Sequence, residues 1–474
     1  MRVAVPAVIG PPETLGAVHF VGIGGAALSG LARLMAQRGL QVSGSDAQDS
    51  PLLESLRALG VTCHIGHQAS HVDGVDTVVV STAVPADNPE VLRAQALGRR
   101  LWPRSAAVQS LLLGHRAVVV TGTHGKTTTT SMLVTALLAC GADPSYAVGS
   151  TLTESGVNAG QGGGPLFVVE GDESDAAIVV YEPYGAVVTN VDVDHLDFFG
   201  TARAYADVFD RFLGRVDPDG FCVCGVDDPG GARLAALSHE LGPRTTTVGL
   251  DPSAVLRAVD VHATPAGSRA VVVSEGRPVG ELTLQVPGPV YVVDALAALA
   301  AGLQLGFTFD DLARGLGGFR GSSRRMEHKG TADGVRVYDS YAHHPVEIRA
   351  DLAAARALAG EGRVLVCFQP HLYSRTRLLG ADMGRALSGA DVVVVLDVYA
   401  AREAPERGIS GRLVAATVAL ARDDVLFEPD RLRAVDMLAA TARAGDLVLT
   451  LGAGDVTTLG PLVLSRLRSQ ERAR

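Results

Sequence analysis

The sequence predicts an α/β protein of three domains: a Rossmann-like N-terminal domain, a central phosphate-loop α/β domain and a Rossmann-like C-terminal domain. Two glycine-rich turns each follow a short apolar run and precede a helical pattern, and strand and helix patterns alternate again from Val335 onward. The 474 residues are also enough for about three domains. We expect domains at residues 1–108, 109–321 and 322–474.

The composition excludes several classes of protein. Hydrophobic residues make up 47% of the chain and charged residues 19%, as in globular proteins. No apolar run approaches the roughly 20 residues of a membrane span, so we expect no membrane partner and a cytoplasmic location. The net charge of −10 argues against nucleic acid as a partner. Five scattered cysteines argue against disulfides, and Cys222 and Cys224 are expected to be buried on a strand.

The first glycine turn follows an apolar run, residues 18–23, and contains Gly22, Gly24 and Gly25. A helical pattern follows, and Asp46 comes about 24 positions after the first glycine, as in dinucleotide-binding domains. A turn that serves only packing is the alternative. We expect a diphosphate on Gly24 and Gly25, near polar residues placed at later strand ends: His67, Ser81, Thr82 and the stretch Asn88–Glu90.

The second glycine turn has the layout of a phosphate-binding loop. Residues 118–121 form a β-branched run, the turn follows, and a helical pattern runs to Ala139. Glycines let backbone N–H groups approach phosphate oxygens, and the helix adds its positive N-terminal end. Lys126 would reach the terminal phosphates and Thr127 would hold Mg²⁺. Val120 replaces the first glycine of the general pattern, so an ordinary strand-to-helix turn is the alternative. The expected contacts to a nucleoside triphosphate here are Gly122, Thr123, His124, Gly125, Lys126, Thr127 and Thr128.

Acidic and imidazole groups follow the next two apolar runs. Glu170 ends the run at residues 166–169, and His195 follows the run at residues 186–189. Because ligands bind at the carboxyl ends of parallel strands, Glu170 and His195 are expected to complete a Mg²⁺ shell with Thr127. Asp172 and Asp175 could join that shell or cap helices. The glycine-rich residues 153–165 predict a flexible surface loop, and residues 254–286 alternate as antiparallel strands do.

The last third of the chain predicts a further doubly wound parallel sheet. Strand patterns occur at residues 335–338, 363–368, 391–397, 424–427 and 446–451, with helical patterns between them. Polar residues follow four of these strands, at residues 339–344, 369–375, 397–403 and 452–455. Since these strand ends would share one sheet edge, we expect a binding site there.

Taken in order, seven motifs resemble the Mur ligases of peptidoglycan synthesis, over about residues 17–460. They are His19–Gly25, Gly122–Thr127, Asp172–Asp175, Asp194–Asp197, Tyr341–Pro345, Phe368–His371 and Ala401–Pro405. The resemblance implies a UDP-sugar-binding domain, a central ATPase domain and a C-terminal domain that closes for catalysis. It implies ATP-dependent amide-bond formation through an acyl phosphate. The motifs are closest to the alanine-adding branch, whose substrates are UDP-N-acetylmuramate and L-alanine. Residues 205–213 carry no lysine, in line with that branch.

The resemblance also implies roles for individual residues. Asp339 would hold the ATP ribose, and Arg325 would add positive charge at the reacting phosphate. The patch that positions the amino acid and the sugar would contain His343, His344, His371 and Arg375. The catalytic set is then Lys126, His195, Arg325 and His343, and the UDP-sugar set is Gly22, Gly24, Gly25, Asp46, His67, Ser81, Thr82 and His124.

The sequence departs from the family pattern near the expected adenine site. Asp294 stands where the family has an asparagine, Val290 replaces a histidine, and Leu372 stands where arginine is common. A carboxylate accepts hydrogen bonds but cannot donate one, so Asp294 bears on adenine recognition. A paralogue of altered specificity, including a tripeptide-recycling ligase, or one without catalysis therefore stays an alternative. A nicotinamide-dependent oxidoreductase is disfavoured by the second nucleotide site. We expect a monomer or weak homodimer.

Overall fold

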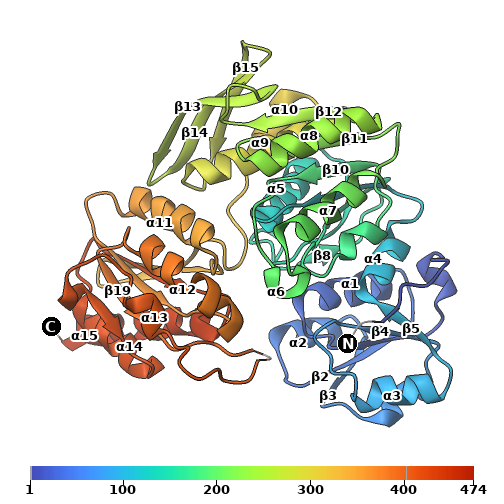
Figure 1. Cartoon of the computed structure of the whole chain (residues 1–474), viewed down its shortest axis with the longest axis horizontal. Coiled ribbons are helices and arrows are strands. Elements are labelled where there is room, and N and C mark those ends of the chain that lie inside the picture. Colours follow the sequence, from blue (N-terminus) through green and yellow to red (C-terminus); the bar gives the residue numbers. More distant parts are fainter. Residues whose placement is uncertain (1–2, 402, 474) are drawn as a thin grey trace. The chain divides into compact units, whose positions relative to one another are not determined.

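The computed structural model describes residues 3–401 and 403–473, so Arg402 of the seventh motif lies outside the described residues. Its strands form three sheets, which follow the sequence from blue to red in Figure 1. The chain divides into two compact units. The first holds residues 1–259, 272–280 and 293–318, and the second holds residues 260–271, 281–292 and 319–474. Three mostly parallel sheets with helices between their strands confirm the predicted α/β class.

The first sheet has five strands in the order β3-β2-β1-β4-β5, and every neighbouring pair is parallel. Strand β1 lies at the centre of this sheet, and all four of its residues are buried, because a central strand of a parallel sheet is covered on both faces. The elements are β1 Val18–Val21, α1 Ala26–Gln37, β2 Val42–Asp46, α2 Pro51–Arg57, β3 Thr62–Ile65, β4 Thr77–Val80, α3 Pro89–Ala96, β5 Arg100–Pro103 and α4 Arg104–Leu112, with short 3₁₀ turns η1 Pro12–Thr14 and η2 Ala69–Val72.

The second sheet has ten strands in the order β15-β14-β13-β12-β11-β10-β6-β9-β7-β8. Its central strand β6 is parallel to both β9 and β10, which places their carboxyl ends at the same edge. The strands are β6 Arg116–Thr121, β7 Ser145–Ala147, β8 Ala159–Gly160, β9 Leu166–Glu170, β10 Gly185–Val188, β11 Phe221–Gly225, β12 Arg244–Gly249, β13 Leu256–Thr264, β14 Gly267–Ser274 and β15 Arg277–Leu284. The helices are α5 Lys126–Ala139, η3 Ala177–Val180, α6 Leu196–Phe199, α7 Ala202–Leu213, α8 Pro229–Leu241, α9 Pro289–Gln304 and α10 Phe309–Leu316.

The third sheet has six strands in the order β16-β17-β21-β18-β19-β20. All pairs are parallel except β16 with β17, so the expectation of a wholly parallel sheet is wrong at this edge. The elements are β16 Glu327–Ala332, β17 Val335–Ser340, α11 Pro345–Ala359, β18 Val364–Phe368, α12 Tyr373–Leu387, β19 Val392–Val395, α13 Arg412–Ala415, η4 Arg422–Asp424, β20 Val425–Phe427, α14 Arg431–Thr441, β21 Leu447–Leu451, η5 Asp455–Thr458 and α15 Leu459–Ala473.

One loop prediction is corrected by the structure. The second half of residues 153–165 is packed, because β8 pairs antiparallel with β7 and the side chain of Asn158 is almost fully buried. Asn158 Nδ2 donates to the carbonyl of Ala26 at 2.6 Å, at the start of α1. A Cβ on Gly30 would lie 3.2 Å from that of Ala159, so a glycine in α1 allows this close approach.

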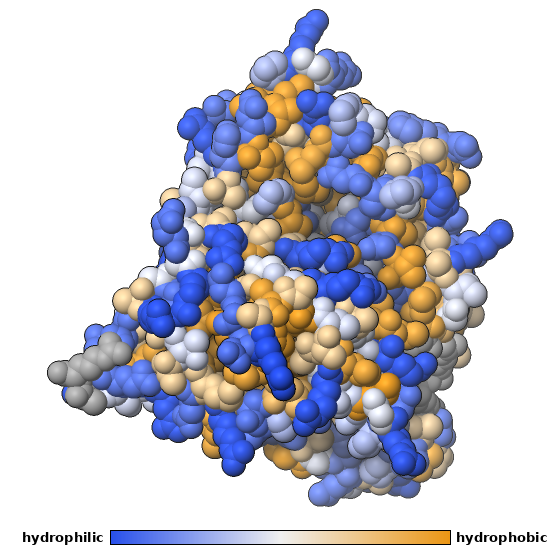
Figure 2. Space-filling model, turned by 60° about the vertical axis from the view of Figure 1, so that its left-hand side comes forward, coloured by the Kyte–Doolittle hydropathy of each residue, from blue (hydrophilic) through white to orange (hydrophobic). Residues whose placement is uncertain are grey.

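The surface carries both kinds of side chain. On the face that Figure 2 shows, hydrophilic residues are interspersed with hydrophobic ones. Within residues 3–401 and 403–473, no helix combines the length and the apolar character that crossing a bilayer requires. Cys222 and Cys224 are both fully buried on β11, as predicted.

Candidate active site

The turn after β6 requires glycine at two positions. Gly122 has φ +132°, and a Cβ there would lie 2.1 Å from Thr189 Oγ1. Gly125 has φ +81°, and a Cβ there would lie 2.4 Å from Asp294 Oδ1. Both conformations are strained for other residues, and both spaces are filled by neighbours. Helix α5 begins directly after this turn, at Lys126, so its N-terminal N–H groups face the loop.

The strand end after β10 holds this loop in place. The N–H of His124 donates to Asn190 Oδ1 at 2.9 Å, and Asn190 Nδ2 donates back to the carbonyl of His124 at 3.0 Å. Thr189 Oγ1 donates to the same carbonyl at 2.5 Å. These reciprocal bonds fix the backbone of residue 124. The sequence analysis assigned no role to Asn190, although its place at a strand end beside β6 was a signal for one.

Lys126 has three acceptors within the chain. Its Nζ donates to the carbonyls of Gly122 at 2.6 Å and Thr123 at 3.0 Å, and to Glu173 Oε1 at 2.9 Å. Burial alone would lower the pKa of Lys126, but the carboxylates of Glu173 and Asp172 raise it above its usual value. The lysine is therefore held as a cation at this turn.

Glu173 is a site residue to which the sequence analysis assigned no role. Its side chain is fully buried, and burial raises its pKa to about 7 despite the attraction of Lys126. The Tyr205 hydroxyl lies 3.3 Å from Glu173 Oε1 and 2.9 Å from Thr123 Oγ1. Glu173 Oε1 also lies 3.7 Å from His195 Nε2. One buried carboxylate therefore connects the loop lysine, α7 and the predicted metal ligand His195.

Two of the three predicted Mg²⁺ ligands are in contact. Thr127 Oγ1 donates to Glu170 Oε1 at 2.9 Å, and the N–H of Gly149 donates to Glu170 Oε2 at 2.6 Å. The third, His195, lies beside Glu173 and Asp194 instead, and its backbone has φ +53° at the start of α6. Among the described residues, no group of three or more His, Cys, Asp or Glu side chains could hold a metal ion. The hydroxyl and carboxylate pair is nevertheless an oxygen donor set that suits Mg²⁺, which usually keeps waters and substrate phosphates as its other ligands.

Asp172 and Asp175 cap turns and pair with an arginine. Asp172 Oδ1 accepts from the N–H of Ser174 at 3.0 Å, and Asp175 Oδ1 accepts from the N–H of Ala177 at 3.0 Å. Arg104 Nη2 lies 3.0 Å from Asp172 and 3.2 Å from Asp175. These contacts favour the capping alternative over a place in a metal shell. The sequence analysis gave Arg104 no partner.

Asp294 reaches the phosphate loop from α9. Its side chain is almost fully buried, and its Oδ1 accepts from Thr129 Oγ1 at 3.2 Å. Gly125, where α5 begins, packs against the same carboxylate. Asp294 therefore places a negative charge at the positive end of α5, beside the expected phosphate site.

The first glycine turn is tied to the end of β2. The N–H groups of Gly22 and Ile23 donate to the carbonyl of Ser45 at 2.8 and 3.1 Å. The N–H of Gly24 donates to Asp46 Oδ2 at 2.8 Å. Of the other residues predicted for this site, Gly25 directly precedes α1, His67 follows β3, and Ser81 and Thr82 follow β4. His124 lies instead after β6 of the second sheet.

Asp339 is fully buried at the end of β17. Its two carboxylate oxygens accept from Thr450 Oγ1 and Thr457 Oγ1, each at 2.7 Å. Arg324 lies 3.5 Å from Asp339 Oδ2 and donates to the carbonyls of Gly452 and Gly454. The guanidinium of Arg325 lies 5.3 Å from the centre of the Tyr341 ring.

The polar strand ends of the third sheet come together, as predicted. The rings of His343 and His371 are 6.1 Å apart, and His371 stacks on Tyr399 at 5.9 Å. His344 caps α11, because its ring accepts from the N–H of Val346 and Glu347 completes the capping box. Arg375 lies in the first turn of α12.

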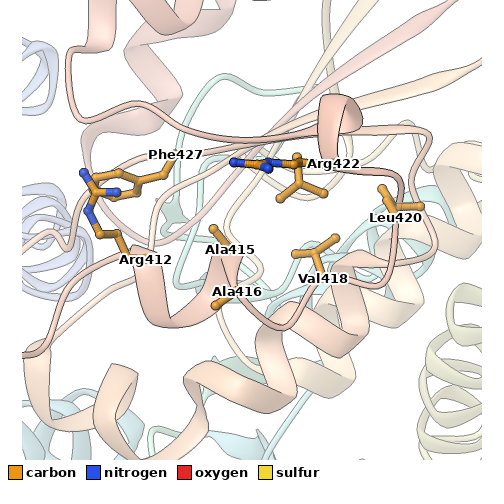
Figure 3. Close-up of a pocket in the computed structure, with 8 residues that line it drawn as sticks. Arg412, Ala415, Ala416, Val418, Leu420, Arg422 and Phe427 are labelled. Carbon is orange, nitrogen blue, oxygen red and sulfur yellow. The ribbon is translucent and has the colours of Figure 1, made fainter.

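A pocket of about 390 Å³ lies elsewhere in the second unit. Figure 3 shows it between α13 and β20, with Arg412 over the ring of Phe427 at 4.3 Å. Its walls are otherwise Ala415, Ala416, Val418, Leu420, Arg422 and Val425. It contains none of the predicted site residues and no acid or base beyond the two arginines.

Comparisons with known proteins agree with this geometry. Three family models match consecutive parts of the chain: Mur ligase family, catalytic domain, at residues 17–116; Mur ligase middle domain, at 120–302; and Mur ligase, glutamate ligase domain, at 324–454. The UDP-N-acetylmuramate–L-alanine ligase of Nocardioides sp. is 55% identical over 98% of this chain and 100% of its own length. That of Kineococcus radiotolerans is 51% identical over 96% of each chain. The crystal structure of the UDP-N-acetylmuramate–alanine ligase of Thermotoga maritima is 28% identical, with a TM-score of 0.82 over 96% of this chain and 99% of that one.

Proposed function

The chain belongs to the Mur ligase family, and from this premise we propose that it joins L-alanine to the lactyl carboxylate of UDP-N-acetylmuramate at the expense of ATP. Relatives at 55% and 51% identity over nearly the whole chain carry this activity in their names. The observation that carries the proposal in the structure is the phosphate loop, with Lys126 at its end and Thr127 in contact with Glu170.

The chemistry explains why the reaction needs such a loop. A carboxylate is a poor acyl donor, because its leaving oxygen is too basic. Transfer of the γ-phosphoryl group of ATP to that oxygen gives an acyl phosphate, which the amine of L-alanine then attacks with loss of phosphate. Two anions meet in the first step, so positive charge must be supplied. Lys126 and the N-terminus of α5 supply it from this loop, and Arg325 is proposed to add to it.

Thr127 and Glu170 are proposed to hold Mg²⁺. Thr127 Oγ1, in the first turn of α5, lies 2.9 Å from Glu170 Oε1 at the end of β9, and both oxygens are hard donors. When bound, Mg²⁺ neutralises negative charge on the ATP phosphates. His195 is retained as a proposed third ligand, since it lies at the next strand end along the sheet, after β10.

The remaining assignments are also proposals. Asp339 is proposed for the ATP ribose, and His343, His344, His371 and Arg375 for the amino acid and the sugar. The turn Gly22–Gly25, with Asp46, His67, Ser81, Thr82 and His124, is proposed for UDP-N-acetylmuramate. We retain domains at residues 1–108, 109–321 and 322–474, a monomer or weak homodimer, and a cytoplasmic location, where ATP and UDP-sugars are available.

The test is phosphate release from ATP and Mg²⁺ by the purified protein. UDP-N-acetylmuramate and L-alanine are added separately and together, and the expected result is release only when both are present. Replacing L-alanine by glycine, L-serine or the peptidoglycan tripeptide then identifies the acceptor. Release that requires the tripeptide would instead identify a recycling ligase. No release with any acceptor, from protein that binds ATP and UDP-N-acetylmuramate, would identify a paralogue without catalysis.

A further inference from the structure

The buried carboxylate of Glu90 accepts a hydrogen bond from Ser45, the residue whose carbonyl holds the first glycine turn. The proposed function assigns no role to this carboxylate. Glu90 lies in the first turn of α3 and is fully buried. Four other elements contribute groups around it: His19 of β1, Ser45 of β2, His67 after β3 and His71 of η2.

The contacts to Glu90 are short and numerous. Ser45 Oγ donates to Oε2 at 2.5 Å, and His67 Nδ1 lies 3.1 Å from the same oxygen. His71 Nδ1 lies 2.6 Å from Oε1, and His19 Nε2 lies 3.7 Å from it. Burial disfavours the carboxylate, but the neighbouring His19, Ser45 and His71 lower the pKa of Glu90 to about 2. Glu90 is therefore an ionised acceptor at neutral pH.

The contacts of Glu90 lead to two parts of the expected diphosphate site, the glycine turn and the ring of His67. The first route runs through Ser45, whose hydroxyl is held by Glu90 and whose carbonyl accepts from the N–H groups of Gly22 and Ile23. The next residue, Asp46, accepts from the N–H of Gly24. The backbone of the glycine turn, which is expected to face the diphosphate, is therefore held by the end of β2. The Ser45 side chain of β2 is in turn held by Glu90.

The second route runs through His67. Its Nδ1 lies 2.9 Å from Ser45 Oγ and 3.1 Å from Glu90 Oε2. The hydroxyl gives its proton to Glu90, so both oxygens act as acceptors toward the ring and Nδ1 carries a proton. This fixes the orientation of the ring and leaves Nε2 as the nitrogen for a ligand, on a side chain that is 25% exposed.

We propose that Glu90 is a positioning residue for the nucleoside diphosphate sugar: its carboxylate orients His67 directly and the glycine turn through Ser45. The inference rests on the proposed function, because it assumes that this turn binds the UDP-sugar. It adds a residue that touches no ligand and acts through two groups that do.

The first experiment uses Glu90→Gln in the full chain. The glutamine side chain has the shape of glutamate, but its NH₂ group is a donor that faces Ser45, His67 or His71. The Ser45 hydroxyl and the His67 ring therefore lose the carboxylate oxygen that both donate to. The expected result is a rise of about tenfold in KM for UDP-N-acetylmuramate and in the Kd for UDP measured by calorimetry without ATP. We expect kcat and the KM values for ATP and L-alanine to stay within about twofold. His67→Gln should also raise this KM, and the rise in the double variant should be smaller than the product of the two single effects, since part of the effect of Glu90 passes through the His67 ring.

The control is Asp73→Asn, which removes an exposed carboxylate directly after η2 that pairs with Arg93. Its KM for the sugar should equal that of the parent. A second readout needs no turnover: ¹H–¹⁵N spectra of the histidine rings should show a proton on His67 Nδ1 in the parent, and this signature should be lost in Glu90→Gln.

Several outcomes overturn the inference. They are an unchanged KM for the sugar in folded Glu90→Gln, an equal loss for all three substrates, or an unchanged His67 ring signature. If Glu90→Gln fails to fold by circular dichroism, Ser45→Ala, which removes only one of the links, is judged by the same criteria. If the parent protein binds neither UDP nor UDP-N-acetylmuramate, the proposed function itself is refuted. This result differs from a failure of the Glu90 inference alone, in which the parent binds UDP and Glu90→Gln binds it equally well.

Discussion

The ammonium of Lys126 lies 2.9 Å from Oε1 of the fully buried Glu173. The other two protons of Lys126 are directed at backbone carbonyls of the same loop. If Lys126 binds ATP as proposed, a phosphate oxygen replaces one of these three acceptors. Glu173 is the one side chain among these three acceptors, and together with Asp172 it raises the pKa of Lys126 and holds the ammonium in place.

Lys126→Met should abolish ATP-dependent phosphate release, with a loss of at least about 10³-fold in kcat. It also leaves Glu173 buried without its cation, so we expect the free energy of unfolding in urea to fall by about 2–3 kcal/mol. Lys329→Met is the control, because Lys329 pairs with Glu327 at a partly exposed position in the second unit. Phosphate release that survives in Lys126→Met would show that the loop does not act on ATP.

Tyr205→Phe removes the hydroxyl that contacts Thr123 and Glu173. Because that hydroxyl is buried, we expect a loss of about 1–2 kcal/mol in the free energy of unfolding and a higher KM for ATP. Tyr184→Phe removes a hydroxyl that contacts only Arg244 at the surface and should change neither quantity. Equal effects of the two substitutions would argue against a role for Tyr205 in holding the loop.

Asp294→Asn removes a negative charge beside Gly125, at the N-terminus of α5. Since ATP brings phosphate charge to the same loop, KM for ATP should fall by about threefold. The free energy of unfolding of the nucleotide-free protein should fall by about 0.5 kcal/mol, because the carboxylate no longer faces the helix dipole. Asp310→Asn, at the exposed start of α10, is the matched control. A higher KM for ATP in Asp294→Asn would mean that the carboxylate itself binds the nucleotide.

Arg104→Met breaks the pairs with Asp172 and Asp175. The arginine is only 13% exposed and both carboxylates stay behind, so the free energy of unfolding should fall by about 2 kcal/mol, less than for a fully buried pair because Asp172 is partly solvated. Arg93→Met, whose pair with Asp73 is exposed, should cost less than about 0.5 kcal/mol. Chemical denaturation of both variants at pH 7 decides between these expectations.

Glu90 also predicts a pH dependence of stability. Its pKa is depressed from 4.5 to about 2, so its contribution is complete above pH 4.5 and is lost as the pH falls toward 2. The difference in unfolding free energy between the parent and Glu90→Gln should therefore narrow by about 2 kcal/mol from pH 5 to pH 3. The facing groups are His19, His64, His67 and His71, and all four are present in both proteins. A difference that stays constant over this range would mean that Glu90 is not held as an anion.

The sequence by itself determined the features that depend on local pattern. The three α/β sheets follow from the alternation of apolar runs and helical patterns, because parallel strands need crossover helices. The phosphate loop followed from its glycines, since Gly122 and Gly125 have the positive φ that the turn requires. The contact between Thr127 and Glu170 was foreseen because parallel strands bring their carboxyl ends to one edge. The packing of Asn158 was not predicted, because its partner Ala26 lies 132 positions away in the chain. The strand β16 was not predicted although it pairs with the next strand, β17, because residues 327–332 contain no apolar side chain except Ala332.

Only the tertiary structure decided which charged groups meet. Glu173 lies 47 positions from Lys126, Asp172 lies 68 from Arg104, and Glu90 lies 45 from Ser45. In the run from Asp172 to Asp175, the sequence offers three acids without indicating which one turns toward the loop. That choice is made by packing, because a buried charge is stable only where a partner and hydrogen bonds offset its loss of water. Sequence spacing therefore predicts where the strands end, and packing in the folded core determines which charged side chains pair.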